Sequence, residues 1–169
     1  MQIDQEIPSI NSLPESDRAS AKKALDYIGL EAGQKIAGTK IDWAFIGSCT
    51  NGRIEDLRLA AQVLKNNKIA AGVTCYIIPG SEAVRAQAIN EGLDEIFSKA
   101  GADFRMPGCS MCLGMNDDKV PSGERCISSS NRNFMGRQGP GSRTHLASPV
   151  TVAASAIEGE ITSGEDYLS

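Results

Sequence analysis

One stretch decides the fold of this chain: residues 43–51, Trp-Ala-Phe-Ile-Gly-Ser-Cys-Thr-Asn. Its first four residues are apolar and predict a short buried strand, and the glycine and serine that follow predict a tight turn. The turn brings Cys49 directly behind the strand. Because open α/β sheets bind their ligands at the carboxyl ends of the strands, Cys49 is a candidate ligand-binding residue.

Helix and strand signals alternate on both sides of this stretch. Ala21, Leu25 and Ile28 share one helical face, and Gly29 is placed to end that helix. Further helices are predicted at residues 57–64, 82–91, 93–100 and 149–157, and further strands at residues 75–78, 104–106 and 125–128. Residues 131–144 are predicted to be a loop.

Strands separated by helices are typical of an α/β fold. We therefore expect a three-layer α/β/α arrangement with a largely parallel sheet covered by helices on both faces. Residues 1–15 contain two prolines and are predicted to be an extended lead-in, followed by a single domain over residues 16–169.

Composition narrows the class of protein. The chain has 169 residues, 41% hydrophobic and 22% charged, which is typical of a globular protein with one sizeable core. A net charge of −4 argues against a dedicated nucleic-acid binder. No apolar run is long enough to span a membrane, and the N-terminus lacks the pattern of a signal peptide. Five cysteines without disulfide-scaffold density favour a reducing, cytoplasmic compartment.

The cysteines fall into two groups. Cys75 and Cys126 lie inside apolar strand signals and are predicted to be buried thiols. Cys49, Cys109 and Cys112 lie in glycine-flanked loops, where a thiol is more often a ligand or a reactive group. Two thiolates separated by two residues can bind one metal centre, but this spacing also suits a redox motif or half of a zinc site.

A second group of polar residues surrounds Gly136. Arg132 and Arg137 carry planar, permanently charged forks that match carboxylates, and Asn131 can donate amide hydrogens to a substrate or a cluster. The alternative is a solvated basic loop. The single histidine, His145, is a possible base, although a lone histidine more often has a structural hydrogen bond.

Three motifs resemble the aconitase family in their order and spacing: residues 45–51, residues 107–112 and residues 130–137. Residues 136–149 are similar, more narrowly, to the large subunits of bacterial 3-isopropylmalate dehydratases. The resemblance covers nearly the whole chain. It implies an aconitase-domain-like fold and a hydro-lyase activity, the removal and re-addition of water that interconverts 2-isopropylmalate and 3-isopropylmalate in leucine biosynthesis.

The same resemblance implies roles for individual residues. Cys49, Cys109 and Cys112 would hold a 4Fe–4S cluster with one open iron, and Asn131 would lie beside it. Arg132 and Arg137 would bind the carboxylates of a small dicarboxylate substrate. No residue of this chain is assigned as a catalytic acid or base. The alternatives are homoaconitate or another 2-hydroxy acid as substrate, or a zinc-stabilised interaction module that uses the three cysteines and His145.

Family large subunits are longer and carry two further α/β domains ahead of the region matched here. We therefore expect this chain to be the third-domain part of such a subunit, as a piece of a longer protein or as a naturally separate polypeptide. Its expected partners are those domains and the small subunit, which brings the family's catalytic serine. By itself the chain is expected to be inactive.

Overall fold

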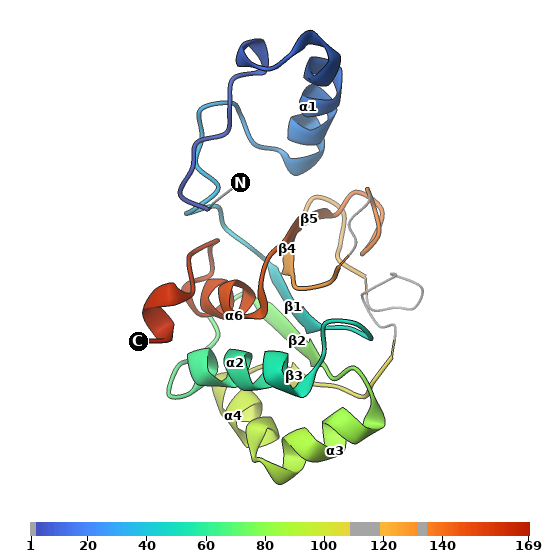
Figure 1. Cartoon of the computed structure of the whole chain (residues 1–169), viewed down its shortest axis with the longest axis vertical. Coiled ribbons are helices and arrows are strands. Elements are labelled where there is room, and N and C mark those ends of the chain that lie inside the picture. The colour runs from blue at the N-terminus through green and yellow to red at the C-terminus, as the bar shows by residue number, and fades with distance from the viewer. Residues whose placement is uncertain (1–2, 109–118, 132–134) are drawn as a thin grey trace.

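The computed structural model describes residues 3–108, 119–131 and 135–169. Within these residues five strands form one sheet in the order β3-β2-β1-β4-β5, and every neighbouring pair is parallel (Figure 1). The strands are β1 (Trp43–Gly47), β2 (Thr74–Ile78), β3 (Asp103–Phe104), β4 (Arg125–Ser128) and β5 (Arg143–Leu146). The predicted α/β fold with a parallel sheet and flanking helices is confirmed.

The described residues form five α-helices, several of which begin or end at a capping residue. They are α1 (Glu15–Ile28), α2 (Ile54–Leu64), α3 (Glu82–Asn90), α4 (Leu93–Ala100) and α6 (Pro149–Glu158), with short 3₁₀ turns at Ile10–Ser12 and Glu165–Tyr167. The hydroxyls of Ser81 and Ser148 accept backbone N–H groups at the starts of α3 and α6. Gly29 ends α1 in the left-handed conformation, as predicted.

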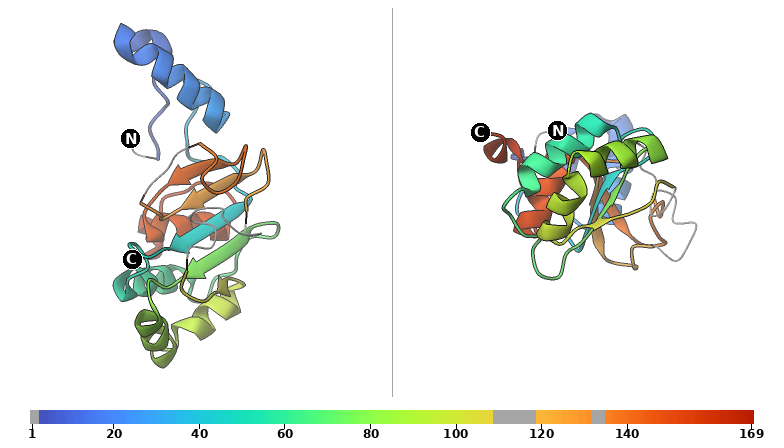
Figure 2. Two further views of the ribbon diagram at one scale, coloured as in Figure 1. Left: turned by 90° about the vertical axis from the view of Figure 1, so that its right-hand side faces the viewer. Right: turned by 90° about the horizontal axis from the view of Figure 1, so that it is seen from below.

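The main core lies between one face of the sheet and three helices. Alternate strand residues, among them Ile46, Ile77 and Ile127, pack in a single buried cluster with apolar residues of α2, α4 and α6. Figures 1 and 2 show these helices side by side against the sheet. The other face carries a smaller cluster of Phe45, Ile78, Val120 and Cys126, with Trp43 and Tyr76 packed against it.

Helix α1 stands beyond the edge strand β5, at the opposite end of the molecule from α3 and α4 (Figures 1 and 2). The Tyr27 hydroxyl accepts the outward-pointing backbone N–H of Thr144 at 3.3 Å. This contact satisfies a donor that an edge strand would otherwise present to solvent.

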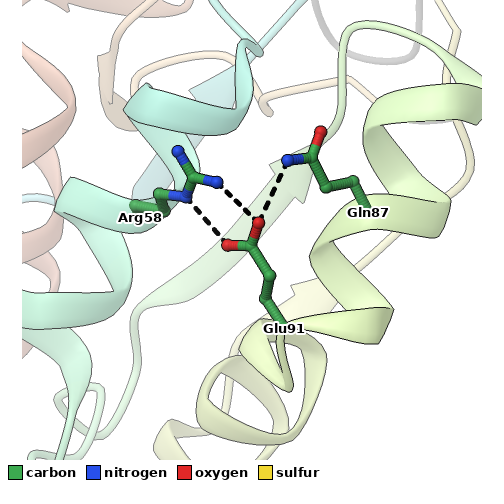
Figure 3. A network of polar contacts seen from close by, with 3 residues as sticks. All are labelled: Arg58, Gln87 and Glu91. Carbon is green, nitrogen blue, oxygen red and sulfur yellow. Dashed lines mark hydrogen bonds and ion pairs between the residues drawn. The ribbon is translucent and has the colours of Figure 1, made fainter.

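An exposed ion pair joins α2 to the end of α3 (Figure 3). Both ends of the Arg58 guanidinium contact the Glu91 carboxylate, at 2.8 and 2.6 Å, and Gln87 donates to the same carboxylate at 3.1 Å. The hydrogen bond from Arg58 lowers the pKa of Glu91. The pair therefore orients α3 against α2 with a bidentate contact that acidification would weaken.

The strand order reverses at β1. The chain adds β2 and β3 on one side of β1 and then returns to add β4 and β5 on the other. The carboxyl ends of β1 and β4 therefore meet at a topological switch point, the usual ligand-binding position of an open parallel sheet. The loop carrying Cys49 follows β1, and the segment leading to Asn131 follows β4.

Two details of the sequence prediction need correction. The sequence predicts a loop over residues 131–144, yet Arg143 and Thr144 begin strand β5, which pairs with β4. The prediction missed this strand because an edge strand of four residues, Arg-Thr-His-Leu, has no run of apolar residues. The third strand is Asp103–Phe104 rather than residues 104–106. Over the part of the chain that the structure describes, no helix has the length and apolar character needed to cross a bilayer.

Candidate functional site at the carboxyl ends of β1 and β4

The turn after β1 exposes Cys49 by means of an unusual backbone. Gly47 has a φ of 102° and Ser48 a φ of 150°, values that residues other than glycine rarely adopt. Ser48 is nevertheless buried, whereas the next residue, Cys49, is exposed and carries a free thiol. A strained turn that projects one cysteine from the end of a central strand is typical of a functional position.

Close backbone packing holds this turn against the end of β2. A Cβ atom added to Gly47 would overlap the carbonyl oxygen of Ile78. A Cβ atom added to Gly52 would lie 2.6 Å from the nitrogen of Gly80 and 2.7 Å from the Ile78 oxygen. Glycine is required at both positions because the two backbones approach too closely for any side chain.

Hydrogen bonds tie the β1 turn to the segment after β4. Gly47 donates its backbone N–H to the Ser129 hydroxyl at 2.9 Å, and Ser129 donates its own N–H to the Phe45 carbonyl at 2.9 Å. The Asn51 side-chain amide donates to the Ser129 carbonyl oxygen at 2.5 Å. The Cys49 turn and the segment leading to Asn131 are therefore one connected unit.

A buried polar network lies behind this unit and joins β4 to β5. The Thr144 hydroxyl donates to Gln138 Oε1 at 2.8 Å, and Gln138 Nε2 donates to the Ser128 hydroxyl at 3.4 Å. Ser128 in turn donates to the Ser130 hydroxyl at 2.8 Å and accepts the Ser130 backbone N–H at 3.1 Å. Since all four side chains are buried, each polar group needs these partners. Sequence reasoning did not single out Gln138.

The described part of the loop around Gly136 lies next to this network. Arg137, immediately before Gln138, is buried with 8% of its surface exposed, and Asn131 is exposed. Gly136 has a φ of 76° and its carbonyl accepts the N–H of Gly139 at 3.1 Å. Gly136 therefore lies in a turn, and Arg137 is inside the fold rather than on a solvated loop.

Three of the predicted site residues, Cys109, Cys112 and Arg132, lie outside the described residues. Among the residues that are described, no group of three or more histidine, cysteine or acidic side chains is positioned to hold a metal. The structure thus places Cys49 and Asn131 behind neighbouring strands. The full set of three thiols stays a prediction.

The two remaining cysteines are buried, as predicted. Cys75 and Cys126 have 2% and 0% of their surface exposed. Burial raises the pKa of Cys75 to about 12 and raises that of Cys126 as well, so neither thiol is a ready ligand.

His145 has the structural hydrogen bond that the sequence favoured. Its Nε2 atom lies 2.6 Å from a guanidinium nitrogen of Arg125. Burial first, and the charge of Arg125 second, lower the pKa of His145 to about 4. Strand alternation places His145 on the opposite face of the sheet from Thr144 and the Gln138 network.

The chain belongs to the aconitase family. Residues 1–159 match the family described as "Aconitase family (aconitate hydratase)".

Proteins named 3-isopropylmalate dehydratase large subunit are similar to this chain over nearly its whole length. The one from Cytophaga hutchinsonii is 52% identical over 167 residues, which are 99% of this chain and 36% of that protein. Those from Roseiflexus castenholzii and Campylobacter jejuni are each 56% identical over 167 residues, 98% of this chain and 35% and 36% of theirs. The chain therefore spans about a third of the length of these relatives, which are hydro-lyase subunits.

Proposed function

We propose that this chain is the cluster-binding and carboxylate-binding part of a 3-isopropylmalate dehydratase large subunit. The observation that carries the proposal is the exposed Cys49, held by a strained turn behind β1 and tied through Ser129 to the segment before Asn131. The identity of more than 50% to large subunits of that name supports the substrate class. Homoaconitate, or another 2-hydroxy acid, is the alternative substrate.

Cys49, Cys109 and Cys112 would hold a 4Fe–4S cluster. The donor set fits this group, because thiolates are the ligands of such clusters and Cys49 is exposed at the ligand-binding edge of the sheet. When bound through three cysteines, the cluster supplies a Lewis-acidic iron for the substrate hydroxyl. Asn131 is proposed to lie beside the cluster.

The chain's own contribution to the reaction is to bind and orient the substrate. Arg132 and Arg137 would each hold a carboxylate of the dicarboxylate substrate by two parallel hydrogen bonds. The burial of Arg137 supports this role, because a buried fork is preorganised and loses little freedom on binding. The acid–base groups would come from the preceding large-subunit domains and from the small subunit, in a cytoplasmic assembly.

The competing proposal is a zinc-stabilised interaction module with His145 as the fourth ligand. The geometry of His145 argues against it, since its Nε2 atom accepts a hydrogen bond from Arg125 and its side chain is on the opposite face from the network behind Cys49. The two proposals also differ in metal content. Reconstitution should give roughly four irons and four sulfides per chain for the cluster, against one zinc for the module.

Cysteine variants of the whole chain test the proposal. After anaerobic reconstitution with iron and sulfide, Cys49→Ser, Cys109→Ser and Cys112→Ser should each abolish the visible absorbance of the cluster. Cys75→Ala and Cys126→Ala serve as matched controls, because their thiols are buried in the core, and both should retain the absorbance. Loss in all five variants, or in none, would contradict the ligand assignment.

A further inference from the structure

A cluster of two arginines and one histidine lies on the opposite face of the sheet from Gln138. Arg125 and Arg143 are the first residues of β4 and β5 and are direct neighbours in the parallel pairing. His145 follows two residues after Arg143, so strand alternation places all three side chains on one face. Because both arginines begin their strands, this cluster is separate from the site at the carboxyl ends.

The Arg125–His145 contact fixes the charge state of the cluster. A guanidinium only donates hydrogen bonds, so the Nε2 atom of His145 must accept the 2.6 Å bond from Arg125. The imidazole is therefore neutral, in agreement with the low pKa that burial and Arg125 give it. The histidine thus orients the Arg125 guanidinium without neutralising its charge.

Neither arginine has a counter-ion among the described residues. The ion pairs that the described residues form within 4.0 Å involve Arg58, Lys99 and Arg105. Neither Arg125 nor Arg143 takes part in one of them. The Asp42 carboxylate accepts the backbone N–H of Arg125 at 2.9 Å, and the Glu124 carboxylate accepts the indole N–H of Trp43. The charge of Asp42 only partly offsets burial and Arg143, which together lower the pKa of Arg125.

Arg143 is positioned by the end of α1. A Cβ atom on Gly29 would lie 2.5 Å from the Arg143 guanidinium carbon, so the planar group lies directly on the backbone there. The carbonyl groups at a helix C-terminus carry partial negative charge, which favours a cation but does not neutralise it. The position therefore orients a second fork beside the first.

We propose that Arg125 and Arg143 bind a small oxyanion, with carboxylate or phosphate oxygens accepting from both guanidinium groups. A buried cation is stable in a protein only when it is paired, and Arg125 has just 8% of its surface exposed. Arg143 and His145 are partly exposed, so the cluster is open to solvent on one side. This limited opening favours a small ion over a segment of another macromolecule.

The test titrates the whole chain, labelled with ¹⁵N, with inorganic phosphate and separately with malonate. Sodium chloride at equal ionic strength is the reference for both. We expect a saturable rise of the thermal midpoint at millimolar anion. We also expect the pKa of His145, followed by NMR of its ring, to rise by at least about half a unit, since a bound anion offsets the charge of Arg125.

Charge-matched variants separate a site from general ionic effects. Arg143→Gln should weaken the anion response at least about tenfold, the effect of losing one charge-assisted hydrogen bond. Lys99→Gln removes an exposed charge from α4, near the far edge of the sheet, and should respond like the parent chain. Arg143 is chosen because the loss of the buried Arg125 would risk unfolding.

Each outcome decides the proposal. Saturation by phosphate alone or by malonate alone supports the site and identifies the class of anion, and saturation by both supports a general oxyanion site. Identical behaviour in chloride, phosphate and malonate would overturn it. So would an Arg143→Gln chain that responds as strongly as the parent. The cysteine variants above leave Arg125 and Arg143 unchanged. The anion test and the test of the iron–sulfur cluster can therefore fail independently.

Discussion

The turn behind β1 depends on single residues whose backbone conformation is demanding. Gly47 combines a positive φ with a backbone approach that leaves no room for a side chain, and Ser48 adopts a positive φ without being glycine. Such conformations are unfavourable and persist only where surrounding contacts enforce them. Here the contacts with Ile78 and Ser129 do so, and their result is an exposed Cys49.

Alanine at Gly47 should therefore be far more destabilising than alanine at another glycine of positive φ. Gly33 is the matched control, with a φ of 86° and no atom within 4 Å of an added Cβ. We expect Gly33→Ala to lower the free energy of unfolding by about 1 kcal/mol, from backbone strain alone. Gly47→Ala should lower it by at least about 3 kcal/mol, because steric overlap with the Ile78 oxygen is added. Urea denaturation of both variants measures the difference, and equal losses would contradict the close approach.

Strands β4 and β5 are joined by more than their backbone ladder. The network through Thr144, Gln138 and Ser128 crosses from the edge strand to the end of the strand beside β1. Gln138 lies between Arg137 and Gly139, and the N–H of Val120 donates to its carbonyl at 2.7 Å. Buried polar contacts of Gln138 thus hold in place the segment that contains Arg137.

Gln138→Leu should be strongly destabilising for this reason. It leaves the Thr144 hydroxyl without its Gln138 partner and removes the amide that donates to the Ser128 hydroxyl. We expect the free energy of unfolding to fall by about 2–3 kcal/mol. The loss from Thr144→Val should not add fully to that from Gln138→Leu, since the two changes break one shared bond. Gln62→Leu, the same change on the exposed face of α2, should stay within about 0.5 kcal/mol. Full additivity in chemical denaturation would show that the network is not coupled.

On the scale of the whole molecule, the helices of the main core cover one face of the sheet and α1 covers its edge. The candidate ligand Cys49 follows the carboxyl end of β1, and Asn131 follows that of β4. Within the described residues, this region contains the Cys49 thiol and the Asn131 amide but no histidine. The single histidine of the chain is engaged with Arg125 on the other face.

The reconstituted chain alone should therefore not hydrate the alkene intermediate of the proposed reaction. A missing general base is expected to cost about 10² to 10⁴ in rate. Adding the small subunit alone should not restore activity, whereas adding the preceding large-subunit domains as well should do so. The measurement is alkene consumption by each mixture. Turnover by the 169-residue chain alone would overturn the view that its active site is shared with other parts of the enzyme.

The sequence by itself was sufficient where the signal is local. The apolar run before Gly47 predicted β1, the helices predicted from residues 82 and 149 begin there as α3 and α6, and Gly29 predicted the end of α1. The burial of Cys75 and the exposure of Cys49 also followed from their immediate neighbours. Strand, cap and turn preferences act over a few residues, so they can be recognised without knowing the fold.

Only the tertiary structure decided which distant residues meet. Strand β5 is polar and short, and it exists because β4 offers it a partner. The same pairing brings Thr144 to Gln138 on one face and His145 to Arg125 on the other. These contacts join residues whose separation along the chain has no regular period. They depend on strand order and register, which cooperative packing of the whole chain sets and no local pattern encodes.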